Sequence, residues 1–372
     1  MQTTGPPRGL TPPAVPDAPP VRRSTFRHHP RILPRIRRTP GSGGGTPRSG
    51  GRESRRRWWP RVVLAVVALL TVAVVTGFAY MWWSWESVPV ATGLGPLPAV
   101  QKVETVLLVG SDSRAEVEGG RFGGSSVTGQ RADTILLLVM PPGHAKATAV
   151  SIPRDLRVEI PGKGTGKLNA AFNGGASSMV PAVQSATGMT VNHYLEINFD
   201  GLRDLSKAAG GVVICTDHPV RDKFSDLDLP NPGCQNLQGD MALAWVRSRH
   251  HEELVDGKWQ QDPTGDLGRI KRQQEFLTKL MGSLAEPDTM LHMPDLASAV
   301  QKDFRRDPGF SYWHLLHTGM RFMPSPSSQL QFTTLPVEPK TIGGVSFVVP
   351  QQPEMKQLLS DLQEGRVPAV SS

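Results

Sequence analysis

Apolar residues along the chain fall into runs of different length, and these predict regions of different structure. Sequence poor in aliphatic residues precedes Trp58, and a run of 24 residues without a charge follows from Val62 to Trp85. Beyond a short proline-containing segment, apolar runs of strand length alternate with amphipathic segments of helical length. This arrangement predicts a tail (1–61), a long apolar helix (62–85), a linker (86–101) and a folded domain (102–366).

Within the domain, the pattern predicts strands separated by helices. The apolar, β-branched runs of strand length are 103–110, 132–140, 147–152, 190–197 and 211–216. Helical spacing is found in SMVPAVQSATG, FDGLRDLSKAAGG, QGDMALAWVRSR and the segment from Asp266. The stretch 285–365 predicts two or three more helices and a strand near LQFTTLPV. Near-continuous apolar strands between helices indicate one α/β domain with a sheet covered on both faces.

The predicted helix that starts near Asp266 directs polar side chains toward the core. At 100° per residue, one stripe collects its apolar residues, Ile270, Leu277, Leu280, Met281 and Leu284. Arg269 and Gln273 lie on the flank of that stripe, one turn apart, whereas Lys271 and Arg272 fall on the far side. We therefore expect Lys271 and Arg272 to face solvent, and we expect an Arg272→Ala change to have little effect.

The formal net charge of +8 is concentrated in the tail. Residues 1–61 hold 14 arginines against Asp17 and Glu53, a local balance of +12, so the rest of the chain carries about −4. The tail is also rich in Pro and Gly, and we expect it to be disordered. A solvated basic tail next to a membrane is the favoured interpretation and a DNA-binding arm the alternative. No nucleic-acid partner is expected for the folded domain.

The uncharged run at 62–85 has the features of a single-pass membrane anchor. As a helix it spans roughly 36 Å, which exceeds the roughly 30 Å of a hydrocarbon core. Arginines 55–57 and 61 precede it, and its far end carries aromatic residues, Tyr80, Trp82, Trp83 and Trp85. The positive-inside rule then places the N-terminus in the cytoplasm and the domain outside the membrane. A cleaved signal peptide is the alternative, which the long leading region disfavours.

Cys215 and Cys234 are the two cysteines of the chain, and both lie in the predicted exported part. Their spacing and an oxidising compartment favour a disulfide, worth roughly 3 kcal/mol in the chain-entropy model. Metal binding by two isolated cysteines is the less favoured alternative.

Charged residues gather where predicted strands begin or end. They are Asp112, Arg114, Arg131, Asp133, Arg154, Asp155 and Arg157, followed by Arg247, Arg249 and Arg269 in predicted helices. Ligands of open α/β sheets bind beyond the carboxyl ends of strands. Converging arginines repel one another unless an anion lies between them, and the guanidinium fork matches phosphate oxygens. Two carboxylates beside a phosphate suggest Mg²⁺. These residues therefore predict a phosphate or diphosphate site.

Six segments in order resemble the motifs of the LytR-CpsA-Psr family: SDSR, RADT, SIPRD with KLNAAF, NFDGL, ALAWVRSR and DLGRIKRQQ. The resemblance covers residues 103–282. It implies a three-layer α/β/α sandwich with a central mixed sheet, behind a transmembrane helix and a disordered tail. In this family the core holds a lipid tail and the diphosphate lies at its mouth.

The resemblance also implies an activity. The family's members are Mg²⁺-dependent phosphotransferases, with Mn²⁺ as a substitute, that move a glycopolymer from a polyprenyl diphosphate carrier to the 6-hydroxyl of muramic acid in peptidoglycan. The Arg-, Gly- and Pro-rich composition suits an actinobacterium, whose polymer could be arabinogalactan. The alternatives are a polyprenyl diphosphate hydrolase that uses the same site, a non-enzymatic envelope or transcriptional regulator, and a protein that only holds the carrier.

The motif positions carry the implied site residues. Asp112 and Asp133 resemble the family's metal ligands. Its diphosphate clamp corresponds to Arg131, Arg154, Arg247 and Arg269, which with Asp133 are the expected catalytic residues. Further expected substrate-binding residues are Lys167, Asn169, Arg249 and Gln273. Of these, Lys167, Asn169 and Arg249, together with Asp155, are equally compatible with structural roles, such as an Asp155–Arg ion pair that orients the clamp. The polar loop 116–129 either shapes the entrance or is a surface insertion.

Overall fold

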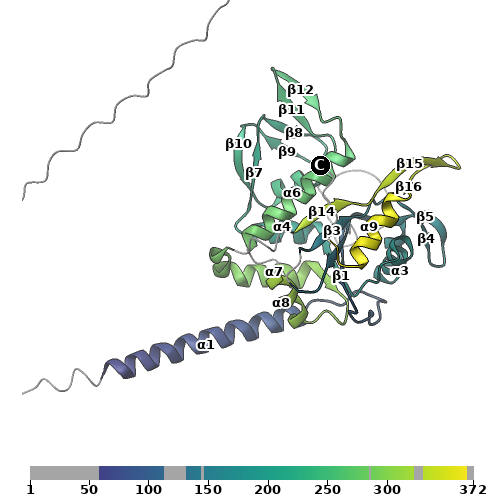
Figure 1. Ribbon diagram of the computed structural model, residues 1–372. Helices are drawn as coiled ribbons and strands as arrows, with labels where there is room; N and C mark the ends of the chain where they lie inside the picture. Colours follow the sequence, from purple (N-terminus) through teal and green to yellow (C-terminus); the bar gives the residue numbers. More distant parts are fainter. Residues whose placement is uncertain (1–57, 113–130, 144–145, 285, 322–329, 367–372) are drawn as a thin grey trace, which may run out of the picture. The chain divides into compact units, whose positions relative to one another are not determined.

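The computed structural model describes residues 58–112, 131–143, 146–284, 286–321 and 330–366. The chain divides into two units after Val63, and apart from residues 58–63 the described residues belong to the second unit. This second unit contains most of a long helix, α1 (Trp59–Glu86), and a mixed α/β domain (Figure 1).

A six-stranded mixed sheet forms the centre of the domain, in the order β13-β6-β1-β2-β3-β14. Its strands are β1 (Glu104–Asp112), β2 (Arg131–Met140), β3 (Thr148–Ser151), β6 (His193–Asn198), β13 (Phe304–Arg306) and β14 (Gln331–Thr334). Strand β1 is parallel to β6 and antiparallel to β2, while β3 is antiparallel to β2 and parallel to β14. The carboxyl ends of β1 and β3 therefore meet the beginning of β2 at one edge of the sheet.

Helices cover both faces of this sheet, which confirms the predicted three-layer architecture (Figure 1). One face carries α2 (Leu168–Ala171), α3 (Ala176–Thr187) and α9 (Glu354–Gln363). The other carries α4 (Phe199–Ala208), α5 (Asp240–Arg247), α6 (Asp266–Leu284) and α7 (Met293–Asp303). Because side chains alternate along a strand, Leu107 of β1 enters the first hydrophobic cluster and Val106 enters the second.

Several short strands outside the central sheet were not predicted. They are β4 (Arg157–Ile160), β5 (Gly164–Lys167), β8 (Val220–Asp222), β9 (Leu227–Leu229), β10 (Gly233–Leu237), β11 (Glu252–Val255), β12 (Lys258–Gln261), β15 (Val337–Ile342) and β16 (Val345–Pro350). The predicted strand at 211–216 is β7 (Val212–Thr216), but it pairs with β10 and does not join the central sheet. Cys215 and Cys234 lie opposite each other in this pair and form the favoured disulfide.

Helix α1 is long and apolar enough to cross a membrane, and it includes the predicted span of residues 62–85. Its last turn packs on the domain, where the Trp85 indole N–H donates to the Phe310 carbonyl at 2.8 Å. Val88 and Ala91, in the segment expected to be a linker, are buried. The predicted linker therefore begins as a packed segment of the domain.

Candidate functional site

A cavity of about 510 Å³ is lined by the central sheet and by helices α4, α5 and α6. Its apolar lining includes Leu108, Leu136, Leu195, Leu202, Leu277 and Leu280. Its polar lining includes six residues expected from the sequence, Asp133, Arg154, Arg247, Arg249, Arg269 and Gln273. The fold thus brings these six polar residues, which are up to 140 positions apart in the sequence, to one hollow that also has an apolar part.

A β-bulge at the beginning of β2 directs two consecutive side chains into this cavity. Gly110 pairs with Thr134 and Ser111 with Ala132, so Asp133 is the extra residue. Neighbouring side chains in a regular strand point to opposite faces, but a bulge changes the direction of one of them. Asp133 and Thr134 both line the cavity. Gly110 makes room for this arrangement, because a Cβ there would lie only 3.1 Å from the Thr134 Cβ.

Asp133 orients two of the arginines. Its Oδ1 accepts hydrogen bonds from Arg154 Nη1 at 2.6 Å and from Arg249 Nη2 at 3.1 Å. Charge-assisted bonds of this kind fix a guanidinium group in one direction. Arg154 comes from the loop after β3, and Arg249 comes from the segment after α5. Asp133 therefore joins the sheet edge to the helical layer.

Two further site residues expected at this edge of the central sheet, Asp112 and Arg131, are described by their backbone only. Asp112, at the end of β1, pairs in register with Arg131, at the beginning of β2. The side chains of both, as well as Arg114 and the loop 116–129, lie outside the described residues. Within the described part of the chain, no group of three or more His, Cys, Asp or Glu side chains could hold a metal ion. Mg²⁺ in phosphate sites typically takes one or two carboxylates and completes its shell with substrate oxygens and water. Asp133 and Asp112, on neighbouring strands, fit that requirement in residue type.

A set of contacts behind the cavity holds the segment that carries Arg154. Asp155 lies 3.5 Å from Arg154 Nε and 2.9 Å from Lys167 Nζ, so the expected Asp155–Arg ion pair is present. The backbone N–H of Asn169 donates to the Arg154 carbonyl at 2.9 Å. Neither Lys167 nor Asn169 lines the cavity, and Arg157 is exposed on β4. These contacts support structural roles for Lys167 and Asn169, and direct substrate binding by them stays a prediction.

Two buried charged residues, Asp222 and Arg272, hold the segment between Arg247 and His250, and the sequence predicted this role for neither of them. The buried Asp222 accepts hydrogen bonds at Oδ2 from the Ser248 hydroxyl and from the backbone N–H groups of Arg249 and His250, at 2.8–2.9 Å. From the other side, Arg272 Nη2 donates to the Ser248 carbonyl at 3.0 Å. Burial alone would raise the pKa of Asp222, but these hydrogen bonds hold that pKa below its usual value. Arg249 therefore extends into the cavity from a fixed backbone.

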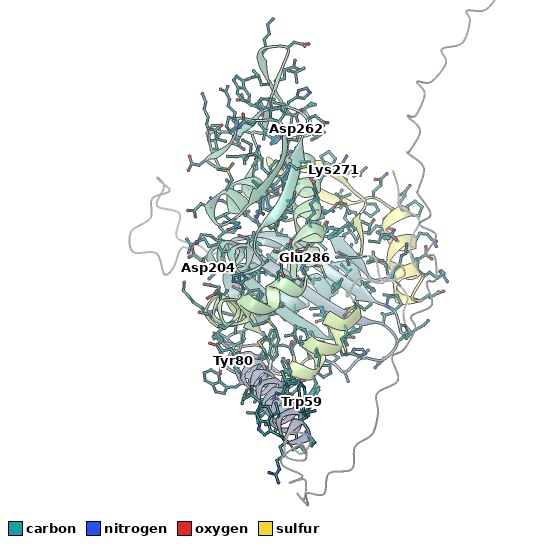
Figure 2. All side chains as sticks on the ribbon, turned by 90° about the vertical axis from the view of Figure 1, so that its left-hand side faces the viewer. Trp59, Tyr80, Asp204, Asp262, Lys271 and Glu286 are labelled. Carbon is teal, nitrogen blue, oxygen red and sulfur yellow. A yellow bond between two sulfur atoms is a disulfide. The ribbon has the colours of Figure 1, made fainter. Side chains whose placement is uncertain are left out.

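Arg272 is buried, so the expectation that it faces solvent is wrong. Its residue exposure is 8 %, and its Nη1 donates to Asp262 Oδ2 at 2.9 Å. The helical stripe used for the prediction left out Phe276, which is fully buried, and Arg272 lies only about 40° around the helix from Phe276. The chain after β12 then brings Asp262 to this flank as a partner. Lys271, labelled in Figure 2 together with Asp262, is exposed as expected.

Arg269 and Gln273 occupy the positions that the helical phase predicted. Arg269 is buried, and both side chains line the cavity. Gln273 Nε2 donates to the Val246 carbonyl at 3.1 Å, which ties α6 to α5. Arg247, at the end of α5, lies with its guanidinium carbon 4.9 Å from the ring centre of Phe199, within cation–π range.

The described lining of the cavity includes four arginines, Arg154, Arg247, Arg249 and Arg269, and the carboxylate of Asp222, which accepts backbone and hydroxyl donors. Guanidinium groups around a partly apolar hollow suit an anion with several oxygens, because each group can donate two hydrogen bonds to it. A phosphate ester has that character.

Comparison with known proteins agrees with the predicted family. Residues 90–364 match the model of the LytR_cpsA_psr family. The probable cell wall biosynthesis protein LcpB of Corynebacterium glutamicum is 36% identical over 282 residues, which cover 72% of this chain and 64% of LcpB. The polyisoprenyl-teichoic acid–peptidoglycan teichoic acid transferase TagU of Bacillus anthracis is 28% identical over 267 residues, which cover 66% of this chain and 78% of TagU.

Solved structures share the fold. The LytR-Csp2A-Psr enzyme from Actinomyces oris aligns with a TM-score of 0.59 at 24% identity, over 74% of this chain and 96% of that one. TagT bound to LI-WTA aligns with a TM-score of 0.55 at 21% identity, over 74% of this chain and 98% of TagT.

The match covers the part of the chain that forms the cavity. The chain spans less than two thirds of the two corynebacterial relatives, 64% of LcpB and 49% of LcpA. Every lining residue of the cavity, from Leu108 to Phe304, nevertheless lies within the matched residues 90–364. With the family model matching well over half of the chain, this protein belongs to the LytR-CpsA-Psr family.

Proposed function

We propose that this protein is a membrane-anchored phosphotransferase that moves a glycopolymer from a polyprenyl diphosphate carrier to peptidoglycan. The observation that supports it most is the lining of one cavity by four arginines and by a set of leucines. A polyprenyl diphosphate has the matching combination of a polyanionic head and a long apolar chain. The volume of about 510 Å³ is within the usual range of ligand pockets.

The choice of polymer class and acceptor rests on the relatives. Two of them are named for cell wall biosynthesis, and TagU is named as a transferase of teichoic acid to peptidoglycan. We extend this to a phosphodiester with the muramic acid 6-hydroxyl as the product. In the proposed topology, α1 crosses the membrane with the N-terminus in the cytoplasm, and the domain with its cavity lies outside, where peptidoglycan is.

The proposed reaction is a displacement at phosphorus. The acceptor hydroxyl attacks the phosphorus that bears the sugar, a new P–O bond forms, and the P–O bond to polyprenyl phosphate breaks, while the hydroxyl proton leaves to solvent. Arg154 and Arg249, oriented by Asp133, and Arg247 and Arg269, from two helices, would donate to the nonbridging and leaving oxygens. Such donors stabilise charge that develops in the transition state, because they are fixed before the reaction.

Asp133 together with Asp112 would hold Mg²⁺, with Mn²⁺ as a substitute. When bound, the ion would neutralise phosphate charge as a Lewis acid. Asp133 would then serve both the ion and the two arginines, so an Asp133→Asn change should weaken metal binding and the orientation of Arg154 together.

A transfer assay tests the proposal. The full chain in detergent is incubated with Mg²⁺, a defined polyprenyl diphosphate-linked glycan and peptidoglycan fragments, and a glycan–peptidoglycan conjugate is expected. Arg269→Ala should lower the rate by roughly 10²–10³, the usual effect of removing one such donor. Lys271→Ala, two residues away on the exposed side of α6, is the matched control and should be as active as the wild type.

The alternatives give different results in this assay. Release of glycan phosphate at the same rate with and without acceptor, with no conjugate, would favour a polyprenyl diphosphate hydrolase. Full complementation of a null strain by an Arg154→Ala, Arg269→Ala double variant would favour a protein that only holds the carrier.

A further inference from the structure

Helix α8 (Tyr312–Arg321) turns an apolar stripe outward instead of toward the core. Trp313 is 61% exposed and Met320 is 54% exposed, and seven residues of helix place them on the same face with the half-buried Leu316 beside them. The opposite face is fixed to the domain, with Tyr312 buried and the Thr318 hydroxyl donating to Glu104 at 3.4 Å. The orientation of this stripe is therefore set by the fold.

Phe78 of α1 packs against the beginning of α8. Its ring centre lies 5.4 Å from that of Tyr312 and 5.6 Å from that of Trp313. Phe78 precedes the end of α1 at Glu86 by eight residues, or about 12 Å along the helix axis. The beginning of α8 therefore lies beside the apolar part of α1 and not beyond its end.

Buried contacts fix this position of α1 against the domain. The Arg306 guanidinium, which is buried, forms an ion pair with Glu86 at 2.8 Å and donates to the Phe310 carbonyl at 3.1 Å. Trp85 packs edge-to-face on Phe310 with ring centres 5.4 Å apart, and its indole N–H donates to the same carbonyl. Because these contacts connect the last turn of α1 to the residues just before α8, the two helices are held as one unit.

We propose that α8 lies in the interface of the outer membrane leaflet, with Trp313, Leu316 and Met320 against lipid. The proposal rests on the membrane-spanning assignment of α1. If residues 62–85 span a hydrocarbon core of about 30 Å, Phe78 lies within it, and so does the level at which Trp313 packs. An exposed Trp beside an exposed His317 suits the boundary between acyl chains and headgroups. Lipid is the occupant that α1 itself brings to this surface.

This second membrane contact has a consequence for the domain. One spanning helix leaves an attached domain free to tilt and turn, whereas a helix together with an interfacial helix at its side restricts both motions. The cavity would then keep a constant orientation to the leaflet in which a polyprenyl-linked substrate resides.

Depth-dependent quenching tests the proposal on the full chain in lipid nanodiscs. A single cysteine is introduced and labelled with the environment-sensitive dye NBD, and the two native cysteines do not react because they form a disulfide. Labels at Trp313→Cys and Met320→Cys should be blue-shifted and quenched by lipids brominated on the acyl chain. A label at Val72→Cys, in the middle of α1, is the membrane control, and one at Val213→Cys, exposed on β7, is the water control.

Each outcome has a distinct meaning. If the Val72 label is quenched and the labels on α8 behave like the Val213 label, the proposal for α8 is wrong and the anchor stands. If the Val72 label is not quenched, α1 does not lie in the membrane and the proposal for α8 falls with it. Labels on α8 that are shielded from both brominated lipid and aqueous iodide would mean that protein covers the stripe, which overturns the assignment to lipid.

Discussion

Replacing Arg272 with alanine should destabilise the domain and slow transfer together, although Arg272 does not line the cavity. Its guanidinium donates to Asp262 at 2.9 Å and to the Ser248 carbonyl at 3.0 Å. The alanine variant leaves Asp262, whose side chain is 17% exposed, without its cation and leaves the carbonyl without this donor. Breaking a partly buried ion pair and a buried hydrogen bond on one side costs about 2–3 kcal/mol.

Thermal unfolding of the full chain in detergent measures this loss. In domains of this size one kcal/mol corresponds to about 2–4 °C, so the Tm should fall by roughly 4–12 °C. The matched control is Lys271→Ala, since Lys271 is the exposed neighbour and exposed substitutions usually change stability by less than about 0.5 kcal/mol. Arg272→Lys should be intermediate, because one ammonium group does not reproduce a two-armed contact.

The effect on activity follows from the position of Ser248 directly before Arg249. When the Ser248 carbonyl loses its donor, the backbone that directs Arg249 toward Asp133 is less constrained. A small misplacement of a charge-stabilising group lowers kcat by roughly tenfold or more at a temperature where both variants are folded. If the Arg272 and Lys271 variants have the same Tm and the same transfer rate, the structural role derived for Arg272 is wrong.

The stability difference between the wild type and Arg272→Ala should also depend on pH, because Arg272 contacts the Asp262 carboxylate. Burial alone would raise the pKa of Asp262, but hydrogen bonds from Thr264 and Arg272 lower it from 3.8 to about 2. Because the pKa is lower in the folded state, the stabilisation is complete above about pH 4 and is lost as the pH falls toward 2. After the partial exposure of Asp262 is taken into account, it amounts to about 1–2 kcal/mol. The Tm difference between wild type and Arg272→Ala should therefore shrink as the pH is lowered, and a constant difference would contradict this assignment.

Three further changes test other parts of the structure. Asp222→Asn should lower the free energy of unfolding, measured in urea, by about 2–3 kcal/mol and should also lower kcat. The reason is that the amide nitrogen cannot accept the hydrogen bonds that fix the segment from Ser248 to His250. A variant with wild-type stability and wild-type kcat would contradict this role. Leu277→Trp narrows the cavity and should raise the KM for donors with a long polyprenyl chain more than the KM for donors with a short one. Thr278→Trp, at an exposed position of the same helix, should change neither KM. If the Leu277 variant raised both KM values equally, the result would count against lipid in the cavity. Removing the disulfide by Cys215→Ala should lower the free energy of unfolding by roughly 3 kcal/mol. The transfer rate should not fall, because β7 and β10 do not line the cavity. A lower transfer rate with unchanged stability would contradict the structural role of the disulfide.

Much of the central sheet could be predicted because β1, β2 and β3 are largely buried on both faces, whereas its three-residue edge strand β13 was not predicted. β1 and β2 are continuous aliphatic runs, and such runs are distinctive in a sequence. The short strands β8, β9, β11 and β12 have three or four residues each, with polar side chains among them, so that no period is visible. They are held by pairing with distant segments, which local sequence does not record.

The difference between a local pattern and a contact with a distant segment also decides which site residues could be predicted. Arg269 and Gln273 could be placed from helical phase alone, because their neighbours Leu277 and Leu280 define the stripe. Helical phase gave the wrong prediction for Arg272, since the burial of Arg272 depends on Phe276 and on Asp262, which lies outside the helix. The direction of Asp133 depends on a bulge that exists only in the pairing of β1 with β2.

Asp222 carried no signal in the sequence at all. It lies 26 residues before Ser248 and was one of many acidic residues in an unpatterned stretch. Its importance appears only when the backbone N–H groups of Arg249 and His250 converge on it. Residues that position others through long-range contacts are therefore the ones that require a structure.

The most direct test of the proposed function follows the phosphorus atom. A polyprenyl diphosphate-linked glycan that carries radioactive phosphorus only in its sugar-bearing phosphate is incubated with the full chain, Mg²⁺ and peptidoglycan fragments. Attack of the acceptor on that phosphorus predicts that the label enters peptidoglycan as a phosphodiester together with the glycan, and that Arg269→Ala, but not Lys271→Ala, prevents it. Label that appears in free glycan phosphate and never in peptidoglycan, at a rate independent of the acceptor, would contradict the proposed transfer.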